Sequence, residues 1–128
     1  MLTYRRIAVV GSREFKNYKQ LSDTLNGFNP NTGQKFVERG DWLVSGGALG
    51  TDSMAQRWAK ETGHTILILY PDWSLGKAAG FLRNAEIVQN ADTVLAFYRK
   101  DHFQEGGTAN TAGWAKKLGK ELHEYEEE

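Results

Sequence analysis

The chain of 128 residues contains no cysteine, and this absence excludes a disulfide framework, a thiolate nucleophile and a zinc–thiolate site. It also has no net charge, because 16 lysine and arginine residues balance 16 aspartate and glutamate residues. We therefore do not expect a broad basic surface that follows a nucleic-acid backbone. A local basic pocket is compatible with this composition.

Long apolar runs are missing as well. The longest ones, such as residues 66–70, are far too short to cross a bilayer, and residues 1–6 are not followed by the apolar core of a secretory signal. The three histidines, His64, His102 and His123, lack the paired spacing of a metal site. We expect a cytoplasmic protein with no metal, no cofactor and no membrane partner.

Apolar runs of strand type alternate along the chain with helical spacings. The length fits one domain over residues 1–128. The patterns predict strands over residues 5–10, 41–44, 65–70, 92–97 and, at an edge, 121–125. They predict four helices, whose expected inward side chains are Leu21, Leu25 and Phe28, then Ala55, Trp58 and Ala59, then Phe81, Leu82, Ala85 and Val88, and finally Trp114, Ala115 and Leu118.

The predicted helices begin at Tyr18 and at Thr51, and the later two cover residues 78–90 and 108–118. Residues 72–77 are expected to form a loop, and the acidic residues 126–128 a solvated tail. Strands that alternate with helices predict an α/β fold: a Rossmann-like, doubly wound, mostly parallel five-stranded sheet with helices on both faces. In such sheets, ligands bind beyond the carboxyl ends of the strands.

Two glycine-rich junctions, residues 45–52 and residues 105–108, each follow a predicted strand and open a predicted helix. The start of a helix offers free backbone N–H groups, and glycine lets a ligand approach them closely, so these junctions favour phosphate binding. No Gly-Lys-Ser/Thr follows the first junction, and its glycines do not have the dinucleotide spacing. The alternative is a tight turn in which Thr51 or Asp52 caps the helix.

Other polar residues follow the remaining predicted strands. Arg13 could hold a phosphate with two hydrogen bonds, and Lys77 with Arg83 could face the same cleft from one helix start. Asp52 could accept hydrogen bonds from ribose hydroxyls, or cap its helix instead. Trp73 could stack on a base or cover the edge of the core. Surface charge is the alternative interpretation of each cation.

Four motifs in this order resemble the SLOG superfamily, and most closely its YspA-like, cpYpsA-related branch. They are Gly11-Ser12-Arg13-Glu14-Phe15, residues 45–48 with Gly50-Thr51-Asp52, residues 76–80 with Arg83-Asn84, and Gly106-Gly107-Thr108. The likeness runs from about Ile7 to Leu118. It implies a Rossmann-like domain that binds nucleotides or nucleotide-derived signals such as ADP-ribose relatives.

The chain is also distantly similar to the Lonely-guy phosphoribohydrolases, which cleave the N-glycosidic bond of nucleoside 5′-monophosphates. Their Arg-Lys-Ala-Glu-Met motif is similar to residues 83–87, which makes Arg83 and Glu86 the candidate catalytic residues. In their second motif, Pro-Gly-Gly-x-Gly-Thr-x-x-Glu, the glutamate is catalytic. Thr111 stands at that position here and supplies neither a general base nor an anion.

The leading hypothesis is a module that senses or sequesters a phosphoribosyl ligand. The alternatives are a phosphoribohydrolase, in which Glu86, Glu105 or Asp52 replaces the missing glutamate, and a single-stranded DNA-binding relative. We expect a homodimer or higher homo-oligomer, because Phe81 and Leu82 offer extra apolar surface. The expected ligand-binding residues are Gly11, Ser12, Arg13, Ser45, Gly46, Gly47, Ala48, Gly50, Thr51, Asp52, Trp73, Lys77, Arg83, Asn84, Gly106, Gly107, Thr108 and Thr111.

Overall fold

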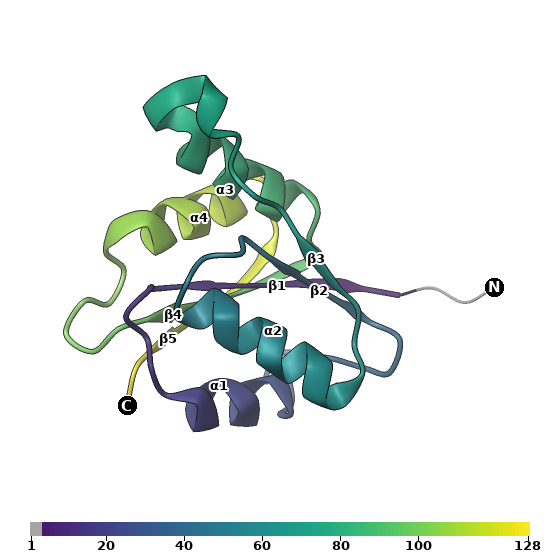
Figure 1. Cartoon of the computed structure of the whole chain (residues 1–128). Coiled ribbons are helices and arrows are strands. Elements are labelled where there is room, and N and C mark those ends of the chain that lie inside the picture. Colours follow the sequence, from purple (N-terminus) through teal and green to yellow (C-terminus); the bar gives the residue numbers. More distant parts are fainter. Residues whose placement is uncertain (1–3) are drawn as a thin grey trace.

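The computed structural model describes residues 4–128 and consists of a sheet with two layers of helices (Figure 1). The strands are β1 (Arg6–Gly11), β2 (Trp42–Ser45), β3 (Ile66–Ile68), β4 (Thr93–Tyr98) and β5 (Glu121–Glu126). The α-helices are α1 (Tyr18–Leu25), α2 (Thr51–Thr62), α3 (Ala79–Gln89) and α4 (Gly106–Lys117). A 3₁₀ segment, η1 (Trp73–Ala78), precedes α3.

The five strands are all parallel and follow the order β3-β2-β1-β4-β5. Helices α1 and α2 cover one face of the sheet, and α3 and α4 cover the other (Figure 1). The predicted fold class, a doubly wound α/β sheet of Rossmann type, is therefore confirmed, including the parallel edge strand β5.

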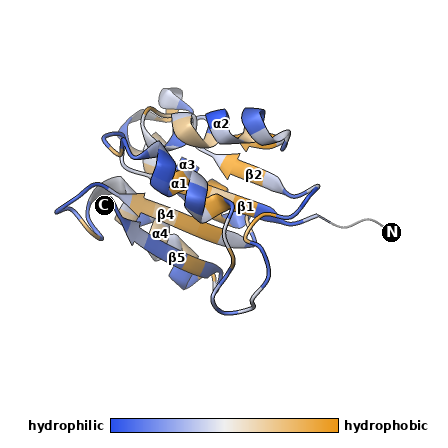
Figure 2. Ribbon diagram, turned by 90° about the horizontal axis from the view of Figure 1, so that it is seen from below, coloured by the Kyte–Doolittle hydropathy of each residue, from blue (hydrophilic) through white to orange (hydrophobic). Residues whose placement is uncertain are grey.

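The central strand β1 is apolar on both faces, as its unbroken β-branched run predicts. Ile7 and Val9 enter the core beneath α1 and α2, whereas Ala8 and Val10 enter the core beneath α3 and α4. All four are buried because neighbouring strands and helices enclose β1 on every side. In Figure 2, β1, β2 and β4 are hydrophobic, whereas the edge strand β5 and parts of the helices are hydrophilic.

The strand order reverses between β1 and β4, since the chain moves from β1 toward β3 and then returns to β4. Crossovers on opposite faces of the sheet leave a gap between the loops at such a reversal. The loops after β1 and β4 therefore flank a crevice at the carboxyl edge of the sheet. This geometry decides where the polar motifs meet.

Several local expectations were wrong. Phe28 lies beyond α1 and is 64% exposed, and Leu118 follows the last residue of α4 and is partly exposed. Phe81 and Leu82 are 57% and 55% exposed, whereas the buried side of α3 is formed by Val88, as predicted, together with Ala79 and Ile87. The expected loop over residues 72–77 contains η1, which is interrupted at Gly76.

The acidic residues 126–128 are not simply solvated. The Glu126 carboxylate accepts a hydrogen bond from the Asp101 backbone N–H, and the Glu127 carboxylate accepts one from the Lys16 N–H. The Glu128 N–H donates to the Gln20 side chain. The end of the chain is thereby attached to the loops that follow β1 and β4.

Within residues 4–128, no helix is long and apolar enough to span a bilayer. The same residues include no group of three or more histidine, aspartate or glutamate side chains arranged to hold a metal ion.

Candidate functional site

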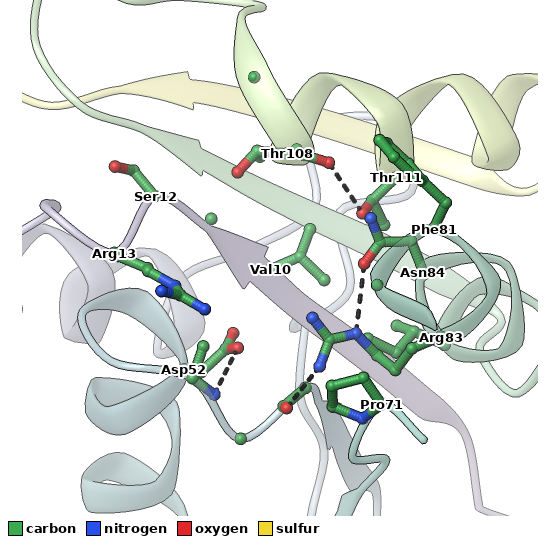
Figure 3. Close-up of a pocket in the computed structure, with 18 of the residues that line it drawn as sticks. Val10, Ser12, Arg13, Asp52, Pro71, Phe81, Arg83, Asn84, Thr108 and Thr111 are labelled. Carbon is green, nitrogen blue, oxygen red and sulfur yellow. Dashed lines mark hydrogen bonds between the residues drawn. The ribbon is translucent and has the colours of Figure 1, made fainter. Parts of the chain in front are cut away.

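A cleft of about 740 Å³ opens at the carboxyl edge of the sheet, where the strand order reverses. Its walls come from the loop after β1, the loop between β2 and α2, the segment from β3 to α3, and the loop between β4 and α4. Figure 3 shows Arg13, Asp52, Arg83 and Thr108 around this common space. Four motifs that are far apart in the sequence therefore share one hollow.

The turn after β1 is locked in place by Thr51. The carbonyl oxygen of Ser12 accepts hydrogen bonds from both the N–H and the Oγ1 of Thr51, at 3.2 Å and 3.0 Å. Gly11 has no space for a side chain, because a Cβ would lie 2.4 Å from the Phe97 carbonyl oxygen and from Thr51 Oγ1. Thr51 is buried and does not line the cleft, so it supports the site from behind.

The glycines between β2 and α2 are required by packing within the chain. Gly47 and Gly50 have φ values of 72° and 71°, a region that side-chain-bearing residues rarely adopt. A Cβ on Gly47 would meet the Tyr70 ring at 2.5 Å, and one on Gly50 would meet the Arg13 carbonyl oxygen at 2.3 Å. The missing side chains leave room for neighbouring parts of the same chain, and Gly47 also lines the cleft.

Helix α2 begins without a side-chain cap. Its N-cap is Gly50, so the proposed capping by Thr51 or Asp52 was wrong. The Asp52 carboxylate instead accepts a hydrogen bond of 3.0 Å from the Ala48 N–H, which lies in the loop before the helix. Asp52 is only 6% exposed and lines the cleft.

Burial raises the pKa of Asp52, although the Ala48 hydrogen bond and the positive charges of Arg83 and Arg13 act in the opposite direction. Burial has the opposite effect on the cation: it lowers the pKa of Arg83. The negative charge of Asp52 opposes this decrease, and the positive charge of Arg13 adds to it. One carboxylate is thus shared between two guanidinium groups. This part of the cleft keeps a positive excess that suits an anion.

Arg83 is fixed by three acceptors. Its Nη1 donates to the carbonyl oxygens of Gly46 and Leu69, at 2.6 Å and 3.4 Å, and its Nε donates to Asn84 Oδ1 at 3.3 Å. Within residues 4–128, Nη2 of Arg83 donates no hydrogen bond. In Figure 3, the Arg83 nitrogen without a dashed line points toward Arg13. The side chain therefore presents donors from an immobilised position.

Arg13 comes from the opposite wall and is exposed. Within the described part of the chain, its guanidinium forms no ion pair. Figure 3 shows it extending toward Arg83 and Asp52. Two arginines, one fixed and one free, thus face the same volume.

The start of α4 forms an open part of the wall. Gly106 has a φ of 73°, and a Cβ at Gly106 or Gly107 would meet nothing within 4 Å. Unlike the glycines before α2, this pair leaves its backbone uncovered on the cleft side. Thr111 is buried one turn later, where its Oγ1 donates to the Gly107 carbonyl oxygen at 3.3 Å.

The segment from β3 to α3 contributes aromatic side chains. Tyr70, Trp73 and Phe81 line the cleft and are 67%, 63% and 57% exposed. Trp73 therefore does not cover the edge of the core. Lys77 lines the same wall from η1.

Most of the candidate ligand-binding residues line the cleft, but Ser45, Gly50 and Thr51 do not. Ser45 is buried, and the other two hold the surrounding loops together. Glu86 is exposed on α3 and lies outside the cleft lining. The candidate carboxylates Asp52 and Glu105 do line it.

Several residues that line the cleft were not among the predicted ligand-binding residues. They include Glu14, Tyr70, Phe81, Arg99 and His102. Arg99 and His102 follow β4 directly, so the rule that favours residues after parallel strands would have identified them. Phe81 was missed because it was assigned to the buried side of α3. Glu14 follows Arg13 in the sequence, and no pattern around it predicted a role in the site.

The model of the YspA, cpYpsA-related SLOG family matches residues 5–76, which include the β1 turn, the junction before α2 and the first part of η1. The chain belongs to this family. The gene 61 protein of Mycobacterium phage D29 is 36% identical over 100 residues, which cover 73% of this chain and 76% of the phage protein. This SLOG protein is therefore similar to the phage protein over most of both lengths.

DNA processing protein A from Streptococcus pneumoniae has a similar structure, with a TM-score of 0.70 and 18% sequence identity. The match covers 94% of this chain but only 50% of the Streptococcus protein. The SLOG chain thus spans half the length of that neighbour. At this identity the likeness shows a shared fold.

Proposed function

We propose that the cleft binds a nucleotide or a nucleotide-derived phosphoribosyl ligand, such as an ADP-ribose derivative, and that the protein senses or sequesters it. The observation that carries the proposal is the convergence of Arg13 and Arg83 on one volume beside the uncovered start of α4. Membership of the SLOG family supports a nucleotide-related role.

Phosphate recognition rests on charge and on preorganised donors. Arg83 is held by the Gly46 carbonyl oxygen, so it does not have to be ordered when a ligand binds. Arg13 supplies a second guanidinium, and the N–H groups of Gly106 and Gly107 belong to a helix start. Charge-assisted hydrogen bonds of this kind are about twice as strong as neutral ones.

Recognition of the nucleoside part rests on Asp52 and Trp73. The Asp52 carboxylate uses one oxygen for the Ala48 N–H, which leaves acceptor capacity for ribose hydroxyls. The exposed indole of Trp73 offers an uncovered ring to a base. A cleft of about 740 Å³ lies within the usual range for small-molecule sites, about 300–1,000 Å³.

Titration calorimetry with nucleoside monophosphates and ADP-ribose tests this proposal. We expect saturable binding that Arg13→Ala weakens about tenfold or more, because one charged hydrogen-bonding group is lost. Arg39→Ala is the matched control, since Arg39 is exposed and lies outside the cleft. Absence of binding by the whole panel, or an equal effect of both variants, contradicts the proposal. Binding only to single-stranded oligonucleotides would favour the DNA-binding alternative.

Hydrolysis of the N-glycosidic bond is a second candidate, and Asp52 is the observation that favours it. The other two carboxylates in the cleft lining, Glu14 and Glu105, pair with Arg99 and His102, whereas Asp52 is buried and its pKa is raised. A carboxyl group of that kind suits general acid–base catalysis. Release of free base from a bound monophosphate supports the enzyme if Asp52→Asn abolishes it at ligand concentrations that saturate the variant, so that weaker ribose binding is compensated. Recovery of intact ligand contradicts it.

We further propose that two copies associate through the apolar surface of α3 and η1. Leu75, Phe81 and Leu82 are each more than half exposed there. Sedimentation velocity should show a dimer that Leu82→Ser converts to a monomer, while Leu49→Ser, at a similarly exposed leucine on another loop, has no effect. A wild-type protein that sediments as a monomer at high concentration contradicts this assignment.

A further inference from the structure

Arg99 and Glu14 form an ion pair at the point where the strand order reverses. Arg99 directly follows Tyr98, the last residue of β4, and Glu14 lies in the loop that follows β1. The two strands are hydrogen-bonded neighbours, and the Ser12 N–H continues the ladder by donating to the Phe97 carbonyl oxygen at 2.9 Å. Both side chains line the cleft.

We propose that Arg99 is an additional anion-binding position, which Glu14 occupies until a further phosphate of the ligand displaces the Glu14 carboxylate. This inference rests on the proposed nucleotide binding and extends it, because it predicts a ligand with more than one phosphate. A carboxylate and a phosphate offer a guanidinium group the same kind of paired oxygen acceptors. Glu14 therefore stands where such an acceptor fits.

The ion pair is suited to exchange. The Arg99 and Glu14 side chains are 40% and 63% exposed, and exposed ion pairs contribute little to stability. Water can solvate the Glu14 carboxylate as soon as it leaves. An incoming phosphate replaces it at Arg99, so the guanidinium keeps an anionic partner throughout.

The backbones beneath the two side chains are held firmly. The Glu14 N–H donates to Ser12 Oγ at 3.0 Å, and the neighbouring Phe15 is buried in the core. On the other side, the buried Tyr98 donates its hydroxyl proton to Glu124 at 2.6 Å. Exchange at Arg99 thus needs side-chain rotation alone.

The loop after Arg99 is also braced in an uncommon conformation. Asp101 and Gln104 have φ values of 67° and 60°, which are unfavourable for residues other than glycine. The Asp101 backbone N–H donates to the Glu126 carboxylate at 2.9 Å. The Gln104 side-chain amide donates to the Glu124 carboxylate at 3.2 Å. Such strain persists only where surrounding contacts maintain it, which agrees with a functional role for this loop.

The charges in the cleft point to the same conclusion. Four cations line it, namely Arg13, Lys77, Arg83 and Arg99, against the carboxylates of Glu14, Asp52 and Glu105. One phosphate can be neutralised by Arg13 and Arg83. For a further phosphate, Lys77 and Arg99 are the remaining cations of the lining, and displacement of Glu14 both releases Arg99 and removes a repelling charge.

The test compares ligands that share adenosine but differ in their phosphates: AMP, ADP and ADP-ribose. Dissociation constants are measured by calorimetry for the wild type, Glu14→Gln, Arg99→Gln and the double variant. We expect Glu14→Gln to bind ADP and ADP-ribose about fivefold more tightly, with AMP changed less than twofold. Arg99→Gln should weaken ADP and ADP-ribose about fivefold, and the double variant should match Arg99→Gln.

Glu38→Gln is the control for net charge, since Glu38 is an exposed carboxylate outside the cleft and its hydrogen bonds with Asp41 are made by its backbone N–H and carbonyl oxygen. Thermal unfolding verifies that each variant is folded. If nucleotides bind but Glu14→Gln changes no affinity, or strengthens AMP as much as ADP, the role of Arg99 is refuted while the proposed function stands. If no nucleotide binds to any of the variants, both fail.

Discussion

The side chain of Arg83 lies directly against the backbone of Gly46. Its Nη1 donates to the Gly46 carbonyl oxygen at 2.6 Å, and a Cβ at position 46 would lie 2.6 Å from the same nitrogen. The glycine therefore creates the space that the arginine fills. A motif in the loop after β2 and a motif in α3 are in this way parts of one arrangement.

Gly46→Ala should displace the Arg83 guanidinium, because the new methyl group occupies its position. We expect a loss of about 1–3 kcal/mol in the free energy of unfolding from overpacking, and at least tenfold weaker nucleotide binding. Urea denaturation and calorimetry measure the two effects. Gly113→Ala is the control, since this helical glycine has nothing within 4 Å and should stabilise the protein by about 0.5–1 kcal/mol. Unchanged ligand affinity in Gly46→Ala would exclude a role for the position of Arg83.

Asp52→Asn should change how stability depends on pH. Burial raises the pKa of Asp52 in the folded protein, so folding favours the protonated carboxyl group. The stability gained in this way is complete below the pKa of the unfolded state and is lost as the pH rises through the folded pKa. Asparagine does not titrate, so the stability of the variant relative to wild type should increase over that range and then level off. Urea denaturation from about pH 3 to about pH 8 measures this difference, and a constant difference contradicts the assignment.

Asp41→Ala should be one of the most damaging substitutions of a charged residue. Asp41 is buried and accepts hydrogen bonds from Arg5 Nη2, the Arg5 N–H and the Glu38 N–H, at 2.8 Å, 2.9 Å and 2.8 Å. Alanine leaves the Arg5 and Glu38 N–H groups without this acceptor and removes the partner of an Arg5 side chain that is 37% exposed, so we expect a loss of about 1–3 kcal/mol. Asp23→Ala, which breaks the exposed pair with Lys19, should cost about 0.5 kcal/mol or less. Similar denaturation midpoints for the two variants would contradict this difference.

Trp58→Phe should cost less than is usual for a buried tryptophan. The indole Nε1 is buried and has no hydrogen-bond partner within residues 4–128, so phenylalanine removes an unsatisfied donor. We expect a loss of about 1–2 kcal/mol from packing, against about 3–5 kcal/mol for Trp58→Ala. Equal losses in chemical denaturation would reveal an acceptor, such as an ordered water molecule, at this nitrogen.

The positions of the strands and the meeting of the motifs were predictable from the sequence. The β-branched run of Ile7 to Val10 determines a strand buried on both faces, and parallel strands bring all their carboxyl ends to one edge. Because Arg13, Gly47 and Gly107 each come after a strand, their position in one cleft could be predicted without any knowledge of side-chain contacts.

Contacts between distant segments were not predictable in this way. Thr51 is a common helix-capping residue, yet its hydroxyl binds the Ser12 carbonyl oxygen. Of the stripe predicted for α3, Val88 is buried, together with Ile87, whereas Phe81 and Leu82 are exposed. Helical spacing indicates which residues share a side, whereas the neighbouring elements decide which side is covered.

The attachment of residues 126–128 has a practical consequence for experiments. Their contacts reach the Lys16 N–H and the Asp101 N–H, in the loops on either side of the cleft, and the C-terminus lies near that edge of the sheet (Figure 1). An affinity tag fused after Glu128 would thus disturb the loops that flank the cleft, whereas a fluorophore attached there would be well placed to report occupancy of the proposed site.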